Sequence, residues 1–170
     1  MSRFPKSNLA ARLQKIISYR REASGLDREI ASRLPLENTP RVRDIGTGTG
    51  LQLRAVHDCN SRAILFGLDL SPLAIELTQK ALGDLSVDLR VGSIACTDYQ
   101  ADFFDVITCN ASLSYWDEPR VCLAELYRIL KPGGQALLFE PHRDIDIQGA
   151  FDSIRENMAD RGPLLRWGAV

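Results

Sequence analysis

Alternating glycines after an acidic residue form the segment of the sequence best suited to chemistry. A strand-like run ends in Asp44, and Gly46, Gly48 and Gly50 follow at every second position. Because glycine has no Cβ, the backbone at these positions can turn sharply and come close to a bound molecule. A helical pattern begins at Leu51, and the free N–H groups at a helix N-terminus favour a carboxylate or a phosphate. The segment therefore predicts a binding loop for a ligand that carries such a group.

The spacing of these glycines bears on the class of ligand. Dinucleotides are bound by the pattern G-x-G-x-x-G, whereas the glycines here read G-x-G-x-G. S-adenosylmethionine is the other ligand that is bound by a turn of this kind. A lone glycine-rich loop separates the two classes weakly, so the segments that follow it have to decide.

The composition is that of an ordinary globular domain. The chain has 170 residues, 45% of them hydrophobic and 25% charged, and a net charge of −1, which corresponds to one domain with a sizeable core. Its basic residues are scattered, so we expect no nucleic-acid partner. No apolar run approaches the roughly 20 residues that span a bilayer, and no signal peptide is apparent. We therefore expect a cytoplasmic protein that does not bind a membrane.

The cysteines support the same compartment. Cys59, Cys96, Cys109 and Cys122 form no C-x-x-C pair, so we interpret them as reduced structural thiols and predict no metal site.

Strands and helices are predicted to alternate along the chain. Strands are expected at residues 41–45, 63–68, 87–91, 104–109 and 135–140. Helices are expected at 27–34, 49–57, 72–82 and 117–130, with Asp27 and Ser71 as N-caps and Pro132-Gly133-Gly134 ending the last one. Further helical patterns precede Gly25 and follow Ile147. This alternation predicts an α/β, doubly wound, Rossmann-like sheet, mostly or wholly parallel, with helices on both faces.

Polar residues follow the predicted strands where ligands bind in such sheets. Ligands lie beyond the carboxyl ends of parallel strands, at the point where the strand order reverses. Asp69, Gly92-Ser93, Asn110-Ala111 and His142 each follow a strand, as the glycine loop does. We expect these five strand ends to converge on one crevice.

Four segments of the chain resemble the class I S-adenosylmethionine-dependent methyltransferases, most of all the small-molecule branch of the ubiquinone- and menaquinone-biosynthesis type. The segments are Asp44-Ile45-Gly46-Thr47-Gly48-Thr49-Gly50, Gly67-Leu68-Asp69-Leu70-Ser71, Phe104-Asp105-Val106-Ile107 with Tyr115-Trp116, and Leu130-Lys131-Pro132-Gly133-Gly134. The first and last are fairly specific in this order and separation. The resemblance covers roughly residues 40 to 141, with residues 1–36 as a helical cap and 145–170 as a C-terminal helix and tail of the same single domain.

The resemblance implies a strand order 3-2-1-4-5, S-adenosyl-L-methionine as the cofactor and a small molecule as the methyl acceptor. Asp44 would bind the methionine amino group, and Asp69 would accept hydrogen bonds from the two ribose hydroxyls. Asn110 and Ala111 would meet the methionyl end of the cofactor. The implied cofactor-binding residues are Asp44, Gly46, Thr47, Gly48, Gly50, Asp69, Leu70, Gly92, Ser93, Ile94, Asn110 and Ala111.

The sequence departs from the family pattern at three places. Ser93 and Ile94 stand where the family usually has an acidic residue that contacts adenine, and Arg43 stands at a strand position that is normally aliphatic. We expect the head of Arg43 to reach a carboxylate or the edge of a face, since buried arginines are usually paired. We expect the C-terminal antiparallel hairpin of the family to be missing. Its absence would expose the edge of strand five, so we favour a homodimer through that edge.

Methyl transfer from a sulfonium needs a base only when the acceptor has to lose a proton first. The candidates are His142 and Tyr115, and Tyr19 with Arg20 is a candidate lid. Asn110 is not followed by the Pro-Pro of methyltransferases that act on planar nitrogens, which argues against DNA-adenine acceptors. The alternatives that stay open are a cofactor-binding subunit that is inactive without a partner and, less favoured by the spacing, a nicotinamide oxidoreductase.

Overall fold

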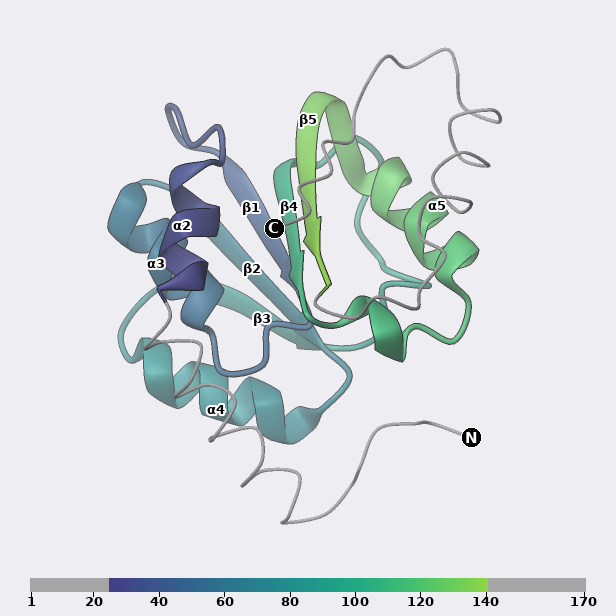
Figure 1. Cartoon of the computed structure of the whole chain (residues 1–170), viewed down its shortest axis with the longest axis horizontal. Coiled ribbons are helices and arrows are strands. Elements are labelled where there is room, and N and C mark those ends of the chain that lie inside the picture. Colours follow the sequence, from purple (N-terminus) through teal and green to yellow (C-terminus); the bar gives the residue numbers. More distant parts are fainter. Residues whose placement is uncertain (1–24, 141–170) are drawn as a thin grey trace.

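The computed structural model describes residues 25–140. Five strands form one sheet in the order β3-β2-β1-β4-β5, and all four neighbouring pairs are parallel. The strands are β1 (Arg41–Ile45), β2 (Ile64–Asp69), β3 (Val87–Val91), β4 (Phe104–Asn110) and β5 (Leu130–Phe139). The helices are α2 (Leu26–Ser32), α3 (Leu51–Cys59), α4 (Pro72–Leu82), the 3-10 helix η1 (Leu113–Tyr115) and α5 (Pro119–Ile129). Figure 1 shows helices on both faces of the sheet, so the predicted fold and strand order are confirmed.

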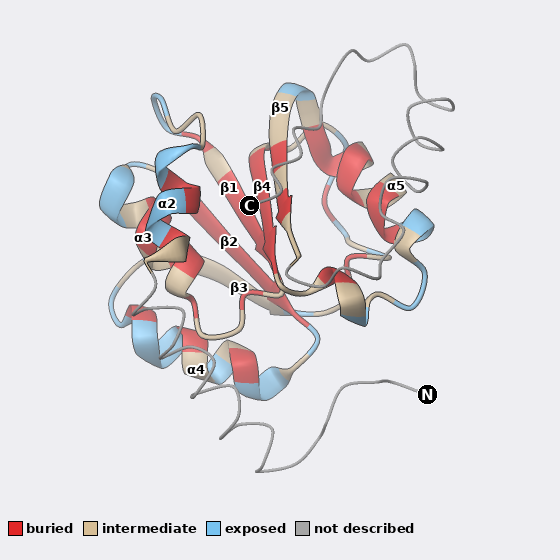
Figure 2. Ribbon diagram, in the orientation of Figure 1, coloured by how far each residue is buried: buried red, intermediate tan, exposed pale blue. Residues whose placement is uncertain are grey.

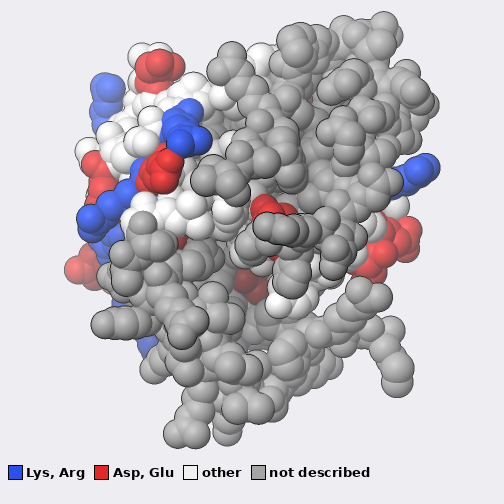
Figure 3. All heavy atoms as spheres, in the orientation of Figure 1, with Lys and Arg blue, Asp and Glu red and all other residues white. Residues whose placement is uncertain are grey.

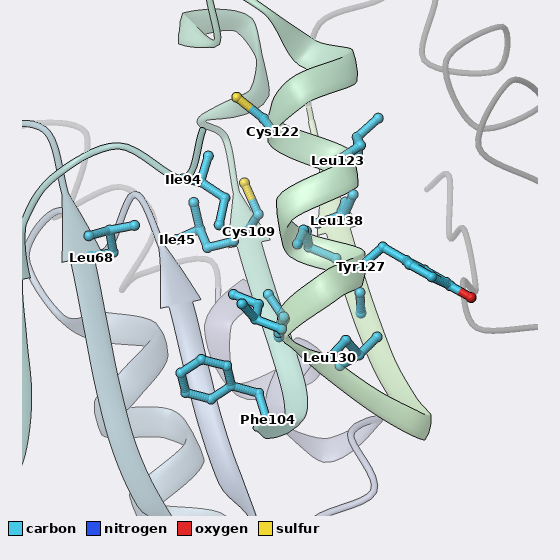
Figure 4. Packing of buried hydrophobic residues seen from close by; sticks show 14 of the residues in the cluster. Ile45, Leu68, Ile94, Phe104, Cys109, Cys122, Leu123, Tyr127, Leu130 and Leu138 are labelled. Carbon is cyan, nitrogen blue, oxygen red and sulfur yellow. The ribbon is translucent and has the colours of Figure 1, made fainter. Parts of the chain in front are cut away.

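Two apolar clusters attach the helices to the sheet. On one face, Leu53 and Val56 of α3 and Leu82 of α4 pack on Val42, Leu65 and other residues of the strands. On the other face, α5 packs on the sheet through a larger cluster that includes the labelled residues of Figure 4. Figure 2 shows that the central strands are buried along most of their length. Burial on both faces explains why these strands read as nearly continuous apolar runs in the sequence.

Local signals place the helix starts, with one correction. Ser71 caps α4 as predicted, because its hydroxyl accepts a hydrogen bond from the backbone N–H of Ala74, and Pro72 is the first helical residue. The prediction that Asp27 caps the preceding helix was wrong. Gly25, with φ +69°, is the N-cap of α2, and Asp27 lies inside the first turn with its side chain buried.

The start of β5 also differs from the prediction. The Pro132-Gly133-Gly134 segment was expected to separate the helix from the strand, but β5 begins at Leu130, directly after α5. Leu130 pairs with Phe104, and Gln135 pairs with Val106, so the residues between them form an irregularity in the ladder. A proline and two glycines fit such a bulge, where regular ladder hydrogen bonds are not made.

Arg43 is fully buried on β1, and the prediction that its head reaches a carboxylate or the edge of a face was wrong. Its Nη1 donates a hydrogen bond of 2.7 Å to the hydroxyl of Tyr99, and its guanidinium lies 4.7 Å from the centre of the Tyr99 ring and 5.7 Å from that of Phe104. Burial lowers the pKa of Arg43 and raises the pKa of Tyr99. Aromatic rings therefore hold this cation where a carboxylate was expected.

Several expectations concern residues that the structure does not describe. They are the N-terminal helix with Tyr19 and Arg20, the residue His142, and the C-terminal segment with the question of the missing hairpin.

None of the helices between Gly25 and Glu140 has the length and apolar character needed to cross a membrane. Acidic and basic side chains are interspersed on the described part of the surface that Figure 3 presents.

Candidate functional site

The glycine loop connects β1 to α3 at the carboxyl edge of the sheet. Gly46, Gly48 and Gly50 all have positive φ angles, at +71°, +59° and +79°. The backbone N–H groups of Gly46 and Thr47 both donate to the carbonyl oxygen of Leu68 on β2, at 2.8 and 3.1 Å. The loop is therefore a fixed part of the sheet edge, and its backbone shape is one that glycine adopts at least cost.

The surroundings of the three glycines differ, and the difference indicates which of them would face a ligand. A Cβ at Gly46 would lie 2.5 Å from the side chain of Ser112, and one at Gly50 would lie 2.9 Å from Thr78 Cγ2. The protein itself thus requires glycine at these two positions. Among residues 25–140, a Cβ at Gly48 would meet only the carbonyl oxygen of Gly46, at 3.8 Å. Gly48 therefore borders open space, as expected where a ligand packs against backbone.

Two side chains from other elements hold Gly48. Its N–H donates to Asp69 Oδ2 at 2.9 Å, and its carbonyl oxygen accepts from Thr78 Oγ1 of α4 at 3.0 Å. Thr78 has no exposed surface and was not predicted as a site residue. In the sequence Thr78 lies within a regular amphipathic helix, and nothing marks it as an anchor for a loop 30 residues earlier.

Asp69 ends β2 and links the loop to the start of α4. Its Oδ1 accepts from the N–H of Ser71 at 2.9 Å, while Oδ2 accepts from Gly48. Burial raises the pKa of this carboxyl group, although the two backbone hydrogen bonds act against the rise. Each carboxylate oxygen has two lone pairs, so both oxygens retain capacity to accept from a vicinal diol.

A second group of polar side chains lies on the α2–α3 face of the sheet. Asp44 is buried at the end of β1, and its Oδ1 accepts from Thr108 Oγ1 of β4 at 2.7 Å. Two residues further along β4, Asn110 donates through Nδ2 to Asp27 Oδ1 of α2 at 3.2 Å. Sequence reasoning missed Asp27, because an acidic residue before a helical pattern reads as a helix cap. Only the packing of α2 brings it to the site.

The N-terminus of α3 supplies a complementary charge. Gly50 is the N-cap, and no side chain caps the helix. The N–H groups of the first turn are favourable to a carboxylate because of their direction and the helix dipole. The edge formed by β1, β2 and β4 thus presents acceptors from Asp44, Asp69 and Asn110 and donors from α3. An amino acid joined to a ribose matches this arrangement.

Comparison with known proteins identifies the family to which this site belongs. A family model described as a methyltransferase domain matches residues 43–138, which is more than half of the chain. The chain belongs to this methyltransferase family. The resemblance stated from the sequence is thereby confirmed, and the family and related structures indicate S-adenosylmethionine as the cofactor.

The curated relatives of this methyltransferase domain include two quinone-related enzymes. The chain is 33% identical over 103 residues to 2-methyl-6-phytyl-1,4-hydroquinone methyltransferase 1 of Oryza sativa, covering 59% of this chain and 31% of that one. It is 29% identical over 116 residues to demethylmenaquinone methyltransferase of Deinococcus radiodurans, covering 66% and 48%. The chain therefore spans a third to a half of the length of these relatives.

Solved structures show the same methyltransferase fold. A putative S-adenosyl-L-methionine-dependent methyltransferase of Methanococcus maripaludis superposes with a TM-score of 0.70 over 94% of this chain and 77% of that one, at 21% identity, which shows the fold alone. A putative methyltransferase of Haloferax volcanii, solved in complex with the Trm112 methyltransferase activator, is 32% identical with a TM-score of 0.59. The superposition covers 67% of this chain and 53% of the Haloferax chain.

The residues of this chain that were predicted to meet adenine lie beyond β2 and β3. Leu70 is exposed to 47%, whereas Ile94 is buried in the cluster beneath α5. The N–H of Gly92 donates to the carbonyl oxygen of Asp69, and Ser93 Oγ accepts from the N–H of Ala95 at 3.1 Å. The role of Ser93 towards adenine stays a prediction, and its hydroxyl already stabilises its own loop.

The residues that were predicted to meet the methionyl end of the cofactor and the acceptor lie after β4. Ala111 has a φ of +58°, which is uncommon for a residue with a Cβ, and its N–H donates to the carbonyl oxygen of Phe139 at 2.7 Å. Tyr115 of η1 is half-exposed. Glu140, directly after β5, accepts from the N–H of Ser114 at 3.2 Å. No cluster of three metal-ligating side chains occurs between residues 25 and 140.

Proposed function

We propose that this protein is an S-adenosylmethionine-dependent methyltransferase that acts on a small-molecule acceptor in the cytoplasm. The observation that carries the proposal is the pairing of Gly48 with Asp69. One carboxylate fixes the open glycine of the loop and keeps acceptor capacity for a ribose diol beside it. Asp44 and the first turn of α3 offer an acceptor for an ammonium and donors for a carboxylate, which are the two ends of a methionyl group.

The residues of the chain supply binding and orientation. When bound, S-adenosylmethionine supplies a methyl group on a positively charged sulfur, and that sulfur takes the bonding electron pair as the acceptor atom attacks. Asp69 would hold the ribose and Asp44 the methionyl end, and Asn110 and Ala111 would lie beside that end. Alignment of this kind supplies about 7–11 kcal/mol in favourable cases. A base is needed only for acceptors that lose a proton, and Tyr115 and His142 remain the proposed candidates.

Calorimetry with S-adenosylhomocysteine and with NAD tests the proposal. We expect the first to bind and the second not to bind. Gly48→Ala should abolish binding, because the new methyl group enters the space beside the loop. The matched control is Gly133→Ala, since Gly133 also has a positive φ, at +78°, and a Cβ there would meet no described residue within 4 Å. Both variants carry a backbone penalty of about 1 kcal/mol, so a loss confined to Gly48→Ala is due to the ligand. Binding of NAD in place of S-adenosylhomocysteine would refute the proposal.

The acceptor class is open to a direct search. Hydroquinones are the first acceptors to test, because the relatives of rice and Deinococcus are named for quinone-type acceptors. The measurement is release of S-adenosylhomocysteine with and without each acceptor.

The second candidate function is that of a cofactor-binding subunit that needs a partner protein. It is supported by the Haloferax relative, whose structure is that of a complex with an activator protein. A chain that binds S-adenosylhomocysteine but methylates no acceptor alone, and gains activity with a partner, would favour this candidate.

The proposed homodimer is tested by light scattering at high micromolar concentration, where a monomer would exclude it.

A further inference from the structure

Asp27 reaches the sheet edge from an element far away in the sequence. The residues Asp27 and Asn110 are 5% and 6% exposed, and their side chains are joined by a hydrogen bond of 3.2 Å across 83 residues of sequence. The backbone of Asp27 is held as well, since Gln52 Nε2 of α3 donates to its carbonyl oxygen at 3.4 Å. The position of Asp27 over the end of β4 is therefore fixed from both α2 and α3.

The hydrogen bond determines which way the amide of Asn110 faces. A carboxylate only accepts hydrogen bonds, so the amide nitrogen has to face Asp27. The amide is planar, and its oxygen consequently points away from Asp27. No residue in the described part of the chain donates to this oxygen of Asn110. Without Asp27 the side-chain amide of Asn110 could rotate. With Asp27 its oxygen is held as an acceptor that points away from the carboxylate.

The neighbours of Asn110 make this corner rich in acceptors. Alternate residues of β4 share one face of the sheet, so Asn110 and Thr108 lie on the same side. Thr108 in turn holds the carboxylate of Asp44. The oxygen Oε1 of Gln52 is also buried, with no hydrogen-bond partner among residues 25–140. Carboxylate and amide oxygens gathered in this way suit a group that only donates, and an ammonium has three N–H donors and no acceptor.

We propose that Asp27 is a positioning residue for the amino acid end of the cofactor: it holds the Asn110 amide so that its oxygen accepts from the α-ammonium group. This inference rests on the proposed function and extends it to α2. Asp27 acts through Asn110, so its removal should affect ligands that carry the ammonium and spare ligands that lack it. The adenosine half of the site, around Asp69, should be unaffected.

The test compares S-adenosylhomocysteine with 5′-methylthioadenosine, which has the adenosine and sulfur but lacks the amino acid. We expect Asp27→Ala to weaken binding of S-adenosylhomocysteine about tenfold, the size of one hydrogen bond to a charged group, and to leave methylthioadenosine within about twofold. Glu29→Ala is the matched control. Glu29 is an exposed acidic residue on the same helix, paired with Arg33, and both affinities should be unchanged.

An exchange of the two side chains separates positioning from packing. Asn110→Asp alone sets two carboxylates against each other and should weaken S-adenosylhomocysteine. The double variant Asp27→Asn/Asn110→Asp restores a donor facing an acceptor and leaves an oxygen towards the ammonium, so it should recover affinity to within about threefold. The comparison of Asn110→Asp with the double variant also tests the inference if Asp27→Ala fails to fold.

Three results would overturn the inference. One is equal affinity of Asp27→Ala and the wild type for S-adenosylhomocysteine, and another is an equal loss for both ligands, which would indicate a purely structural role. The third is a double variant no better than Asn110→Asp. A wild-type protein that binds neither ligand would instead refute the proposed function itself, so the two failures are distinguishable.

Discussion

The guanidinium of Arg43 donates to the hydroxyl of Tyr99 at 2.7 Å, and this bond joins the middle of β1 to the loop between β3 and β4. Tyr99 also forms edge contacts with Phe66 and Phe104, at ring-centre distances of 5.9 and 4.9 Å. Arg43 Nε and Nη2 have no hydrogen-bond partner among the described residues. The Tyr99 hydroxyl is therefore the main polar contact of a fully buried cation.

Tyr99→Phe should destabilise the protein by about 1–3 kcal/mol, because it removes this contact and leaves the buried cation with aromatic faces alone. Urea denaturation of the variant measures the loss. Arg43→Met/Tyr99→Phe should be more stable than Tyr99→Phe, since an apolar side chain of similar size replaces the buried guanidinium that has lost its hydrogen-bond partner. If the double variant is the less stable of the two, the guanidinium contributes through the aromatic rings and not through the Tyr99 hydroxyl.

Asp69→Ala should weaken binding of S-adenosylhomocysteine by about 1.5–3 kcal/mol, the range for hydrogen bonds to a charged group. The variant loses the acceptors for the ribose and also the tie between Gly48 and Ser71. Calorimetry measures the affinity, and Asp84→Ala, at an exposed position, is the control. Unchanged affinity in Asp69→Ala would remove Asp69 from the ribose site.

Binding of S-adenosylhomocysteine should fall as the pH is lowered towards the raised pKa of Asp69. Burial raises the pKa of Asp69 above its ordinary value of 3.8, so the group protonates at a higher pH than an exposed aspartate and then loses acceptor capacity. Protonation of Asp69 weakens ligand binding but stabilises the fold. The native state binds the proton more tightly than the unfolded state, so this group lowers the free energy of unfolding as pH rises from the ordinary pKa to the raised one. Affinity measured against pH, with Asp69→Ala as the reference, isolates the effect; a flat profile would contradict it.

Thr78→Val should weaken S-adenosylhomocysteine binding and stability by about 1 kcal/mol each. The substitution keeps the side-chain volume but removes the hydroxyl that donates to the carbonyl oxygen of Gly48. Thr78→Ser retains the hydroxyl and should bind almost as the wild type does. Calorimetry and thermal unfolding of both variants check this prediction, which fails if valine and serine give the same affinity.

Much of the fold follows from local sequence. The bounds of β1 and β3 and the Ser71 cap with Pro72 were predicted, because alternation, buried apolar runs and helix caps depend on residues that are neighbours in the chain. The ends of most other elements shifted by one or two residues. The position of the glycine loop and of Asp69 at the sheet edge followed from the same alternation and from the parallel order of the strands.

Tertiary packing decided the rest. The sequence determined that Gly46, Gly48 and Gly50 form a turn. Only the structure shows that Ser112 and Thr78 exclude a Cβ at Gly46 and Gly50, while no described side chain would meet one at Gly48. Asp27 read as a helix cap, and it became a partner of Asn110 because α2 packs across the end of β4. A local pattern specifies what each segment becomes; a hydrogen bond between residues 83 positions apart depends on how the segments are brought together, which no short window of sequence records.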